Sequence, residues 1–136
     1  MQLFTAGLLV IKNRKLLLAF SNNKECYYLP GGKVDNEETA IGALCREIAE
    51  ELNVQLDQDK VSFFTHITAL AYGEKNGIIM EQDCFITSQE ITPSASAEIG
   101  SLQYFSLASY QKEPNLAPGA VMILEILTEK GYIENE

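Results

Sequence analysis

The sequence predicts one domain, residues 1–136, with an α/β or α+β fold in which helices cover a mixed sheet. Segments with strand character occur before, between and after two segments with helical periodicity, and this order supports the fold class. The composition is 46% hydrophobic and 21% charged, as in ordinary globular proteins, and the length suits one core. The pattern alone does not decide between α/β and α+β.

The first strand-like segments flank a polar turn. Phe4–Ile11 and Leu16–Ser21 are apolar runs on either side of residues 12–15, so they are predicted to pair as a hairpin. Tyr27–Leu29 is a brief extended piece. It stops at Pro30–Gly32, where a proline followed by two glycines predicts a loop.

A helix is predicted from Glu37 to Leu52. Its apolar residues recur at helical spacing and form one stripe: Ile41, Leu44, Ile48 and Leu52. Asp35 and Glu38 have the spacing of a capping box with Asp35 at the N-cap, and Asn36 is the alternative cap.

The second half of the chain has three more strand candidates. Val61–Tyr72 and Ile78–Thr87 are rich in β-branched and aromatic residues, and Asn76-Gly77 between them suggests a hairpin turn. Leu102–Leu107 is a further short strand. The closing helix is predicted over Pro118–Lys130, because proline suits the first turn of a helix and glycine, here Gly131, suits its end.

Charge and cysteine usage exclude several classes of protein. A formal net charge of −9 repels a phosphate backbone and disfavours general nucleic-acid binding. Cys26, Cys45 and Cys84 lie far apart and without metal-ligand spacing, so reduced, mostly buried thiols in a cytoplasmic protein are expected. No apolar run reaches membrane length, and the N-terminus lacks the features of a signal peptide.

Three carboxylates are predicted to share one face of the first helix. Glu47, Glu50 and Glu51 are spaced by one, three and four residues, so their side chains are neighbours. Such a cluster suits Mg²⁺, which prefers carboxylate oxygens, and the alternative is a solvated acidic face. The preceding Gly31 and Gly32 favour the metal site, because glycines let the backbone approach a ligand closely.

Residues 32–54 resemble the Nudix box, the signature of the Nudix hydrolase family. That signature reads Gly, five residues, Glu, seven residues, Arg-Glu, an aliphatic residue, any residue, Glu-Glu, any residue, Gly and an aliphatic residue. The matching positions are Gly32, Glu38, Arg46, Glu47, Ile48, Glu50, Glu51 and Val54. One position departs: Asn53 stands in place of the final glycine, which is a mild change because asparagine also adopts the left-handed conformation at a helix end.

The resemblance implies an α/β/α sandwich, with a mixed sheet between helices, and a role for each matching residue. Glu47, Glu50 and Glu51 would bind Mg²⁺, with Mn²⁺ as a substitute, and the Gly31 carbonyl would be a further ligand or near neighbour. Arg46 would orient the glutamates through charge-assisted hydrogen bonds. Arg46, Glu47 and Glu50 are therefore the catalytic candidates in the box. Glu38 is interpreted as structural, and Gly32 and Lys33 are predicted to contact the substrate.

A general base is predicted outside the box. Glu98 precedes the strand at Leu102–Leu107, near where some family members carry a catalytic glutamate, and Glu81 is the rival candidate. The alternative for Glu98 is an exposed loop residue. His66 is interpreted as structural, because the sequence identifies no partner for it.

The implied reaction is metal-assisted attack of water on a phosphorus atom of a nucleoside diphosphate derivative. The resemblance favours a MutT-like (d)NTP pyrophosphohydrolase that cleans nucleotide pools, acting as a monomer or homodimer on a small nucleotide. Hydrolysis of dinucleoside polyphosphates or ADP-ribose-like substrates is an alternative. Tyr72 lies near a tyrosine of some dinucleoside polyphosphate hydrolases, although packing is the simpler explanation.

Two alternatives come from other classes. A Nudix-derived nucleotide-binding module without catalysis should have lost its ligands, whereas Glu47, Glu50 and Glu51 all remain. A diphosphate isomerase on the same fold would need additional catalytic residues, which the sequence does not identify.

Overall fold

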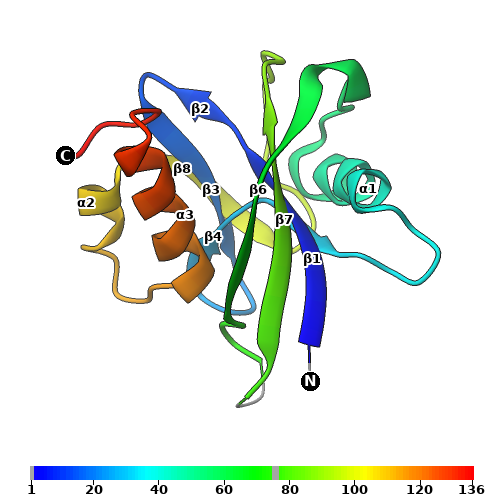
Figure 1. Ribbon diagram of the computed structural model, residues 1–136, viewed down its shortest axis with the longest axis horizontal. Helices are drawn as coiled ribbons and strands as arrows, with labels where there is room; N and C mark the ends of the chain where they lie inside the picture. The colour runs from blue at the N-terminus through cyan, green and yellow to red at the C-terminus, as the bar shows by residue number, and fades with distance from the viewer. Residues whose placement is uncertain (1, 75–76) are drawn as a thin grey trace.

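A computed structural model describes residues 2–74 and 77–136. Two layers of helix enclose strands, with α1 (Ala40–Leu52) on one side and α3 (Pro118–Glu129) on the other (Figure 1). This arrangement confirms the predicted α/β fold with mixed strands between helices. No helix in the described residues is long and apolar enough to cross a bilayer.

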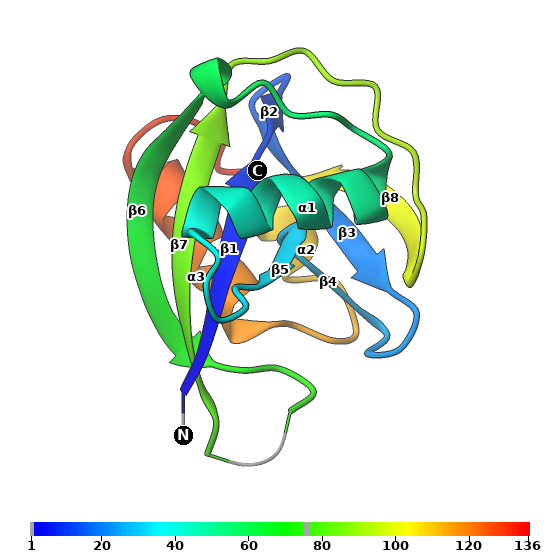
Figure 2. The same cartoon turned by 90° about the vertical axis from the view of Figure 1, so that its right-hand side faces the viewer.

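The first sheet has the order β5-β1-β7-β6. Its strands are β1 (Gln2–Leu9), β5 (Gly31–Lys33), β6 (Val61–Leu70) and β7 (Ile79–Thr87). β1 pairs with β7 in parallel, whereas the β5–β1 and β6–β7 pairs are antiparallel, so the sheet is mixed. Helix α1 lies across β1 and β5 (Figure 2).

The second sheet is antiparallel and centres on β3 (Lys15–Ser21). Its other strands are β2 (Ile11–Lys12), β4 (Cys26–Tyr28) and β8 (Ile99–Phe105), each paired with β3. The predicted hairpin of Phe4–Ile11 with Leu16–Ser21 is therefore only partly correct. The chain leaves the first sheet after Leu9 and enters the second at Ile11. The predicted first strand therefore pairs with β3 only through β2, while its longer part, β1, pairs with β5 and β7.

Two apolar clusters, one on each side of the strands, form the core. Leu8 on β1 and Leu17 on β3 pack with the buried face of α1, which includes Leu44. Leu9 and Leu16, their chain neighbours, pack with α3 instead. Successive side chains of a strand point to opposite faces, so a single strand contributes to both clusters. Cys26 and Cys84 are buried and Cys45 is half-buried, and all three are free thiols, as expected from their spacing in the sequence.

The first helix begins later than predicted. Thr39 is the N-cap, and its hydroxyl accepts a hydrogen bond from the Gly42 N–H at 3.1 Å. Glu37 adopts a positive φ of 77°, which interrupts the helical path. The prediction of Asp35 as the cap is wrong, because Asp35 and Glu38 close a separate turn before the helix, where the Asp35 N–H donates to Glu38 Oε1 at 3.0 Å.

Other elements also differ from the predictions. The sequence predicts a loop at Pro30–Gly32, but Gly31 and Gly32 are extended in β5 because they pair with β1. The predicted strand Leu102–Leu107 extends over Ile99–Phe105 and is followed by a short helix, α2 (Leu107–Tyr110), capped by Ser106. A single 3-10 turn, η1 (Gln58–Lys60), precedes β6. The predicted turn at Asn76-Gly77 includes Asn76, which lies outside the described residues.

Asn53 ends α1 in the left-handed conformation, with φ 55° and ψ 38°, as its place in the motif predicts. Its side-chain amide also donates to Ser94 Oγ at 2.9 Å. We expect Asn53→Gly to change the free energy of unfolding by less than about 1 kcal/mol, because the lost hydrogen bond is offset by glycine's ease in this conformation. Asn53→Ala should lower the free energy of unfolding by about 1–2 kcal/mol, since alanine is strained in the left-handed conformation.

Urea unfolding of these two variants, with Ser94→Ala as the control for the hydrogen bond alone, measures the difference. Equal stability of Asn53→Gly and Asn53→Ala would contradict the conformational explanation.

Candidate active site

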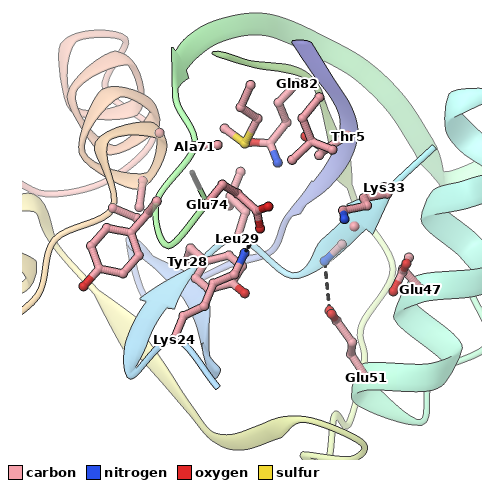
Figure 3. Close-up of a pocket in the computed structure, with 18 of the residues that line it drawn as sticks. Thr5, Lys24, Tyr28, Leu29, Lys33, Glu47, Glu51, Ala71, Glu74 and Gln82 are labelled. Carbon is pink, nitrogen blue, oxygen red and sulfur yellow. Dashed lines mark hydrogen bonds and ion pairs between the residues drawn. The ribbon is translucent and has the colours of Figure 1, made fainter. Parts of the chain in front are cut away.

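A cavity of about 310 Å³ opens beside the first sheet, where α1 lies against β5 (Figure 3). Its wall comes from several elements that are far apart in sequence, including β1, β5, α1, β7 and the start of α3. The cavity gathers seven residues that the sequence predicted for the site: Gly31, Gly32, Lys33, Arg46, Glu47, Glu51 and Glu98. Helix α1 and strand β5 thus bring both halves of the motif to one place.

Glu51 is the most buried of the three glutamates. Its side chain turns from α1 towards β5, where the Gly31 N–H donates to Glu51 Oε1 at 3.0 Å. Only 7% of the residue is exposed. Burial raises the pKa of Glu51 to about 8, against the opposing effect of the Gly31 hydrogen bond. A nearby cation would restore the charged form, so this carboxyl is suited to bind one.

Glu47 lies one turn before Glu51 and faces the same cavity. Burial raises its pKa as well. Gly32 makes room for this side chain: a Cβ at position 32 would stand 2.4 Å from Glu47 Cδ. The second glycine of the pair is therefore required by a side chain of α1 that packs directly over it.

Arg46 connects the helix to the preceding turn and to β5. Its guanidinium donates two hydrogen bonds of 2.9 Å to the carboxylate of Glu38 and one of 3.1 Å to the Lys33 carbonyl. A further N–H donates to Glu47 Oε2 at 3.1 Å. The Arg46 guanidinium lowers the pKa of Glu38 to about 2. Glu38, predicted as structural, thus acts through Arg46 and holds it against Glu47.

We expect Arg46→Lys to reduce turnover by about tenfold, because an ammonium cannot reproduce the planar fork that contacts Glu38 and Glu47 together. The melting temperature should change little, since the guanidinium is one-third exposed. Steady-state kinetics and a melting curve check this. Glu38→Gln weakens the same pair from the other side and should show a similar loss, whereas full turnover in both variants would contradict a positioning role.

Glu50 differs from its two neighbours. Its side chain is 56% exposed, and its Oε1 lies 3.8 Å from Arg46 Nη1. Glu47 and Glu51 line the cavity, whereas Glu50 is exposed and is not among the residues of its wall. In the described residues, no three histidine, cysteine, aspartate or glutamate side chains converge on one metal position.

The two candidate bases lie in different places. Glu98 lines the cavity, and its carboxylate accepts a hydrogen bond from Asn23 Nδ2 at 2.9 Å. Glu81 lies on β7 beside Gln82, and because neighbouring residues of a strand face opposite ways, it points away from the wall that Gln82 lines. Glu81 instead holds His66 Nε2 at 2.7 Å. Of the two candidates, Glu98 is therefore the one that lies at the cavity.

His66 has partners that the sequence could not identify. Its other ring nitrogen, Nδ1, lies 2.8 Å from Asp83 Oδ1, so the imidazole bridges Asp83 and Glu81 across β6 and β7. The hydrogen bonds to Asp83 and Glu81 raise the pKa of His66.

Several cavity residues carry no signal in the motif. Thr5, Tyr28 and Gln82 line the wall, and Lys24 forms an ion pair of 3.0 Å with Glu74 across it. Tyr72, predicted to be a packing residue, is partly buried against the α3 cluster and also lines the cavity. These residues come together only through sheet pairing and loop packing, so spacing in the sequence could not reveal them.

The NUDIX domain family matches residues 1–125 of the chain. The chain belongs to the NUDIX family. This assignment covers nearly all of the described fold, including the motif residues of β5 and α1 that line the cavity. It confirms the predicted class of enzyme, a Nudix pyrophosphohydrolase. A sequence search among curated proteins finds no match.

Solved NUDIX structures share the fold at low sequence identity. A MutT NUDIX hydrolase from Burkholderia pseudomallei has a TM-score of 0.71 and 23% identity, and the match covers 91% of this chain and 95% of that one. A C. elegans Ap4A hydrolase, solved as a binary complex, has a TM-score of 0.70 and 21% identity, with 94% and 96% covered.

A third structure is a bifunctional NMN adenylyltransferase/ADP ribose pyrophosphatase from Francisella tularensis, complexed with AMP and a Mn ion. It has a TM-score of 0.69 and 23% identity, and the match covers 96% of this chain and 42% of that one.

Proposed function

We propose that this protein is a divalent-cation-dependent hydrolase of nucleoside triphosphates, releasing a nucleoside monophosphate and pyrophosphate in the manner of a pool-cleaning enzyme. The observation that carries the proposal is the buried Glu51 beside Glu47 at the wall of the cavity, against the Gly31-Gly32 strand. Buried carboxylates without a basic partner are costly, and a bound cation offsets that cost.

The donor set fits Mg²⁺ or Mn²⁺. Magnesium takes one or two carboxylates and completes its shell with water and substrate phosphates, so Glu47 and Glu51 suffice as the fixed ligands. Glu50, which is exposed and adjacent to Glu51 in α1, and the Gly31 carbonyl are further candidate ligands. A Mn ion in the Francisella tularensis relative supports the same class of cation. When bound, the cation supplies charge neutralisation for the diphosphate and polarises the attacking water.

The chain's own residues supply positioning and proton transfer. Arg46 holds the Glu47 carboxylate in place. Lys33, at the end of β5, lines the cavity, and its ammonium group is proposed to contact a substrate phosphate. Glu98 is the proposed base: it lines the same cavity, and its carboxylate accepts a hydrogen bond from Asn23. Glu98→Gln should therefore reduce turnover without loss of substrate binding.

The substrate class is proposed from the size of the cavity and the relatives. The described cavity suits one nucleotide better than two, which favours a triphosphate over a dinucleoside polyphosphate. The similar MutT hydrolase supports this choice. The Ap4A hydrolase and the ADP ribose pyrophosphatase make their own named substrates the alternatives to test.

A substrate screen tests the proposal. Purified protein with Mg²⁺ or Mn²⁺ is incubated with the eight common (d)NTPs, Ap4A and ADP-ribose, and released phosphate and pyrophosphate are measured separately. Pyrophosphate from one or more triphosphates is the expected result. Cleavage of Ap4A or ADP-ribose alone would replace the proposed substrate. Binding of nucleotides without any cleavage would favour a non-catalytic binding module.

A further inference from the structure

Thr5 on β1 and Gln82 on β7 form a polar pair on the cavity wall, apart from the proposed catalytic groups. The two residues are direct partners in the parallel register of β1 and β7, so their side chains stand side by side on one face of the sheet. Both are almost fully buried, with 8% and 7% exposed. Figure 3 shows them together on one side of the cavity, with Glu47 and Glu51 on another.

The hydroxyl of Thr5 has an unmet hydrogen-bonding capacity. Among the buried side-chain nitrogen and oxygen atoms of the described residues, Thr5 Oγ1 is the one without a partner. Leaving a buried hydroxyl unpaired is unfavourable, and such groups in native proteins call for an explanation. Because the cavity reaches this residue, a ligand bound there can supply the partner.

The amide of Gln82 is similarly underused and is held in place. Within the described residues, its oxygen accepts a weak hydrogen bond from Cys84 Sγ at 3.9 Å. The amide lies over Gly7, where a Cβ would stand 3.1 Å from Gln82 Nε2. Gly7 therefore leaves space that the amide fills, and the packing fixes a donor and an acceptor at the cavity wall.

We infer that Thr5 and Gln82 recognise the nucleobase of the substrate and set its base preference. This inference rests on the proposed function in one respect, which is that the ligand is a nucleotide. An amide and a hydroxyl carry no charge and offer donors and acceptors together, which matches the edge of a nucleobase rather than a phosphate. The neighbouring wall residues Leu29 and Met80 are apolar and suit the flat faces of a ring.

Binding of metal-free protein to nucleoside monophosphates tests this inference without relying on catalysis. Calorimetry compares the four ribonucleoside monophosphates with ribose 5-phosphate, which lacks a base. We expect at least one monophosphate to bind about tenfold or more tightly than ribose 5-phosphate. Thr5→Val and Gln82→Leu should each remove most of that advantage while affecting ribose 5-phosphate little.

Thr68→Val is the matched control. Its hydroxyl donates to Glu81 on the face of the sheet away from the cavity, so base preference should be unchanged. Melting curves verify folding, and Thr5→Val should melt no lower than the wild type because it removes an unpaired hydroxyl. A lower melting temperature with unchanged base preference would mean that Thr5 is structural, and would overturn its role.

The outcomes separate the two proposals. If no monophosphate binds more tightly than ribose 5-phosphate, or if both variants keep the wild-type preference, the base-recognition inference is overturned even when triphosphates are hydrolysed. If base preference depends on Thr5 and Gln82 but no nucleotide is cleaved, the inference stands and the hydrolase proposal fails.

Discussion

Replacing Glu51 by glutamine should reduce turnover by about 10²-fold or more and weaken Mn²⁺ binding, while the fold remains intact. Glutamine keeps an oxygen that can accept the Gly31 N–H bond, so the contact between α1 and β5 survives. What disappears is the ability of this side chain to become a charged carboxylate when a cation binds at the wall of the cavity. The variant therefore separates the electrostatic role of Glu51 from its structural role.

The same variant has a pH-dependent effect on stability. In the metal-free protein the pKa of Glu51 is about 8, above the ordinary value of 4.5, so folding favours the protonated form. The contribution of Glu51 to the free energy of unfolding is most favourable below pH 4.5. It is lost as the pH rises towards 8, because the carboxyl of the unfolded chain releases its proton at a lower pH. Glu51→Gln should therefore melt higher than the wild type at about pH 9 and at a similar temperature near pH 5.

Calorimetric titration with Mn²⁺, kinetics and melting curves at the two pH values measure these effects. Added Mg²⁺ should narrow the gap in melting temperature at high pH, since a cation stabilises the charged form. Glu125→Gln is the control, because it makes the same replacement at an exposed position of α3. Equal Mn²⁺ binding and turnover in wild type and Glu51→Gln would count against the proposed metal site.

Alanine at the two glycines of β5 should affect two different properties: stability at position 31 and turnover at position 32. Gly31 has φ +140°, and a Cβ there would stand 2.0 Å from the Ala6 carbonyl oxygen of β1. Backbone cannot move aside cheaply, so Gly31→Ala should destabilise the protein by about 3 kcal/mol or more. At Gly32 the clash is with the Glu47 side chain, which can rotate. Gly32→Ala should stay folded but lose about 10²-fold in turnover, because it displaces the Glu47 carboxylate that is proposed to bind the cation.

Urea unfolding and kinetics on both variants check this contrast. Gly131→Ala is the control for conformational strain alone, since Gly131 has φ +81° and a Cβ there would meet no atom within 4 Å. Gly131→Ala should lower the free energy of unfolding by only about 1–2 kcal/mol and leave turnover unchanged. A stable and fully active Gly32→Ala would show that Glu47 does not need its present position.

The elements that the sequence predicts well are governed by contacts near in the chain. The apolar stripe of α1 and the left-handed end at Asn53 follow from helical periodicity and from residue preference at a helix terminus. The same periodicity brings Glu47 and Glu51 to one side of the helix. The start of α1 is less predictable, because both Asp35 and Thr39 have side chains able to cap, and the positive φ of Glu37 decides between them.

The sequence by itself therefore determined the motif and the helix that carries it. Only the tertiary structure decided that Gly31 and Gly32 form a strand beside β1, that Glu38 holds Arg46, and that Thr5 stands next to Gln82. The physical reason is how far apart in the sequence the interacting residues lie. A helix sets the relation of residues three or four apart, whereas strand order and register are set by packing of the whole core.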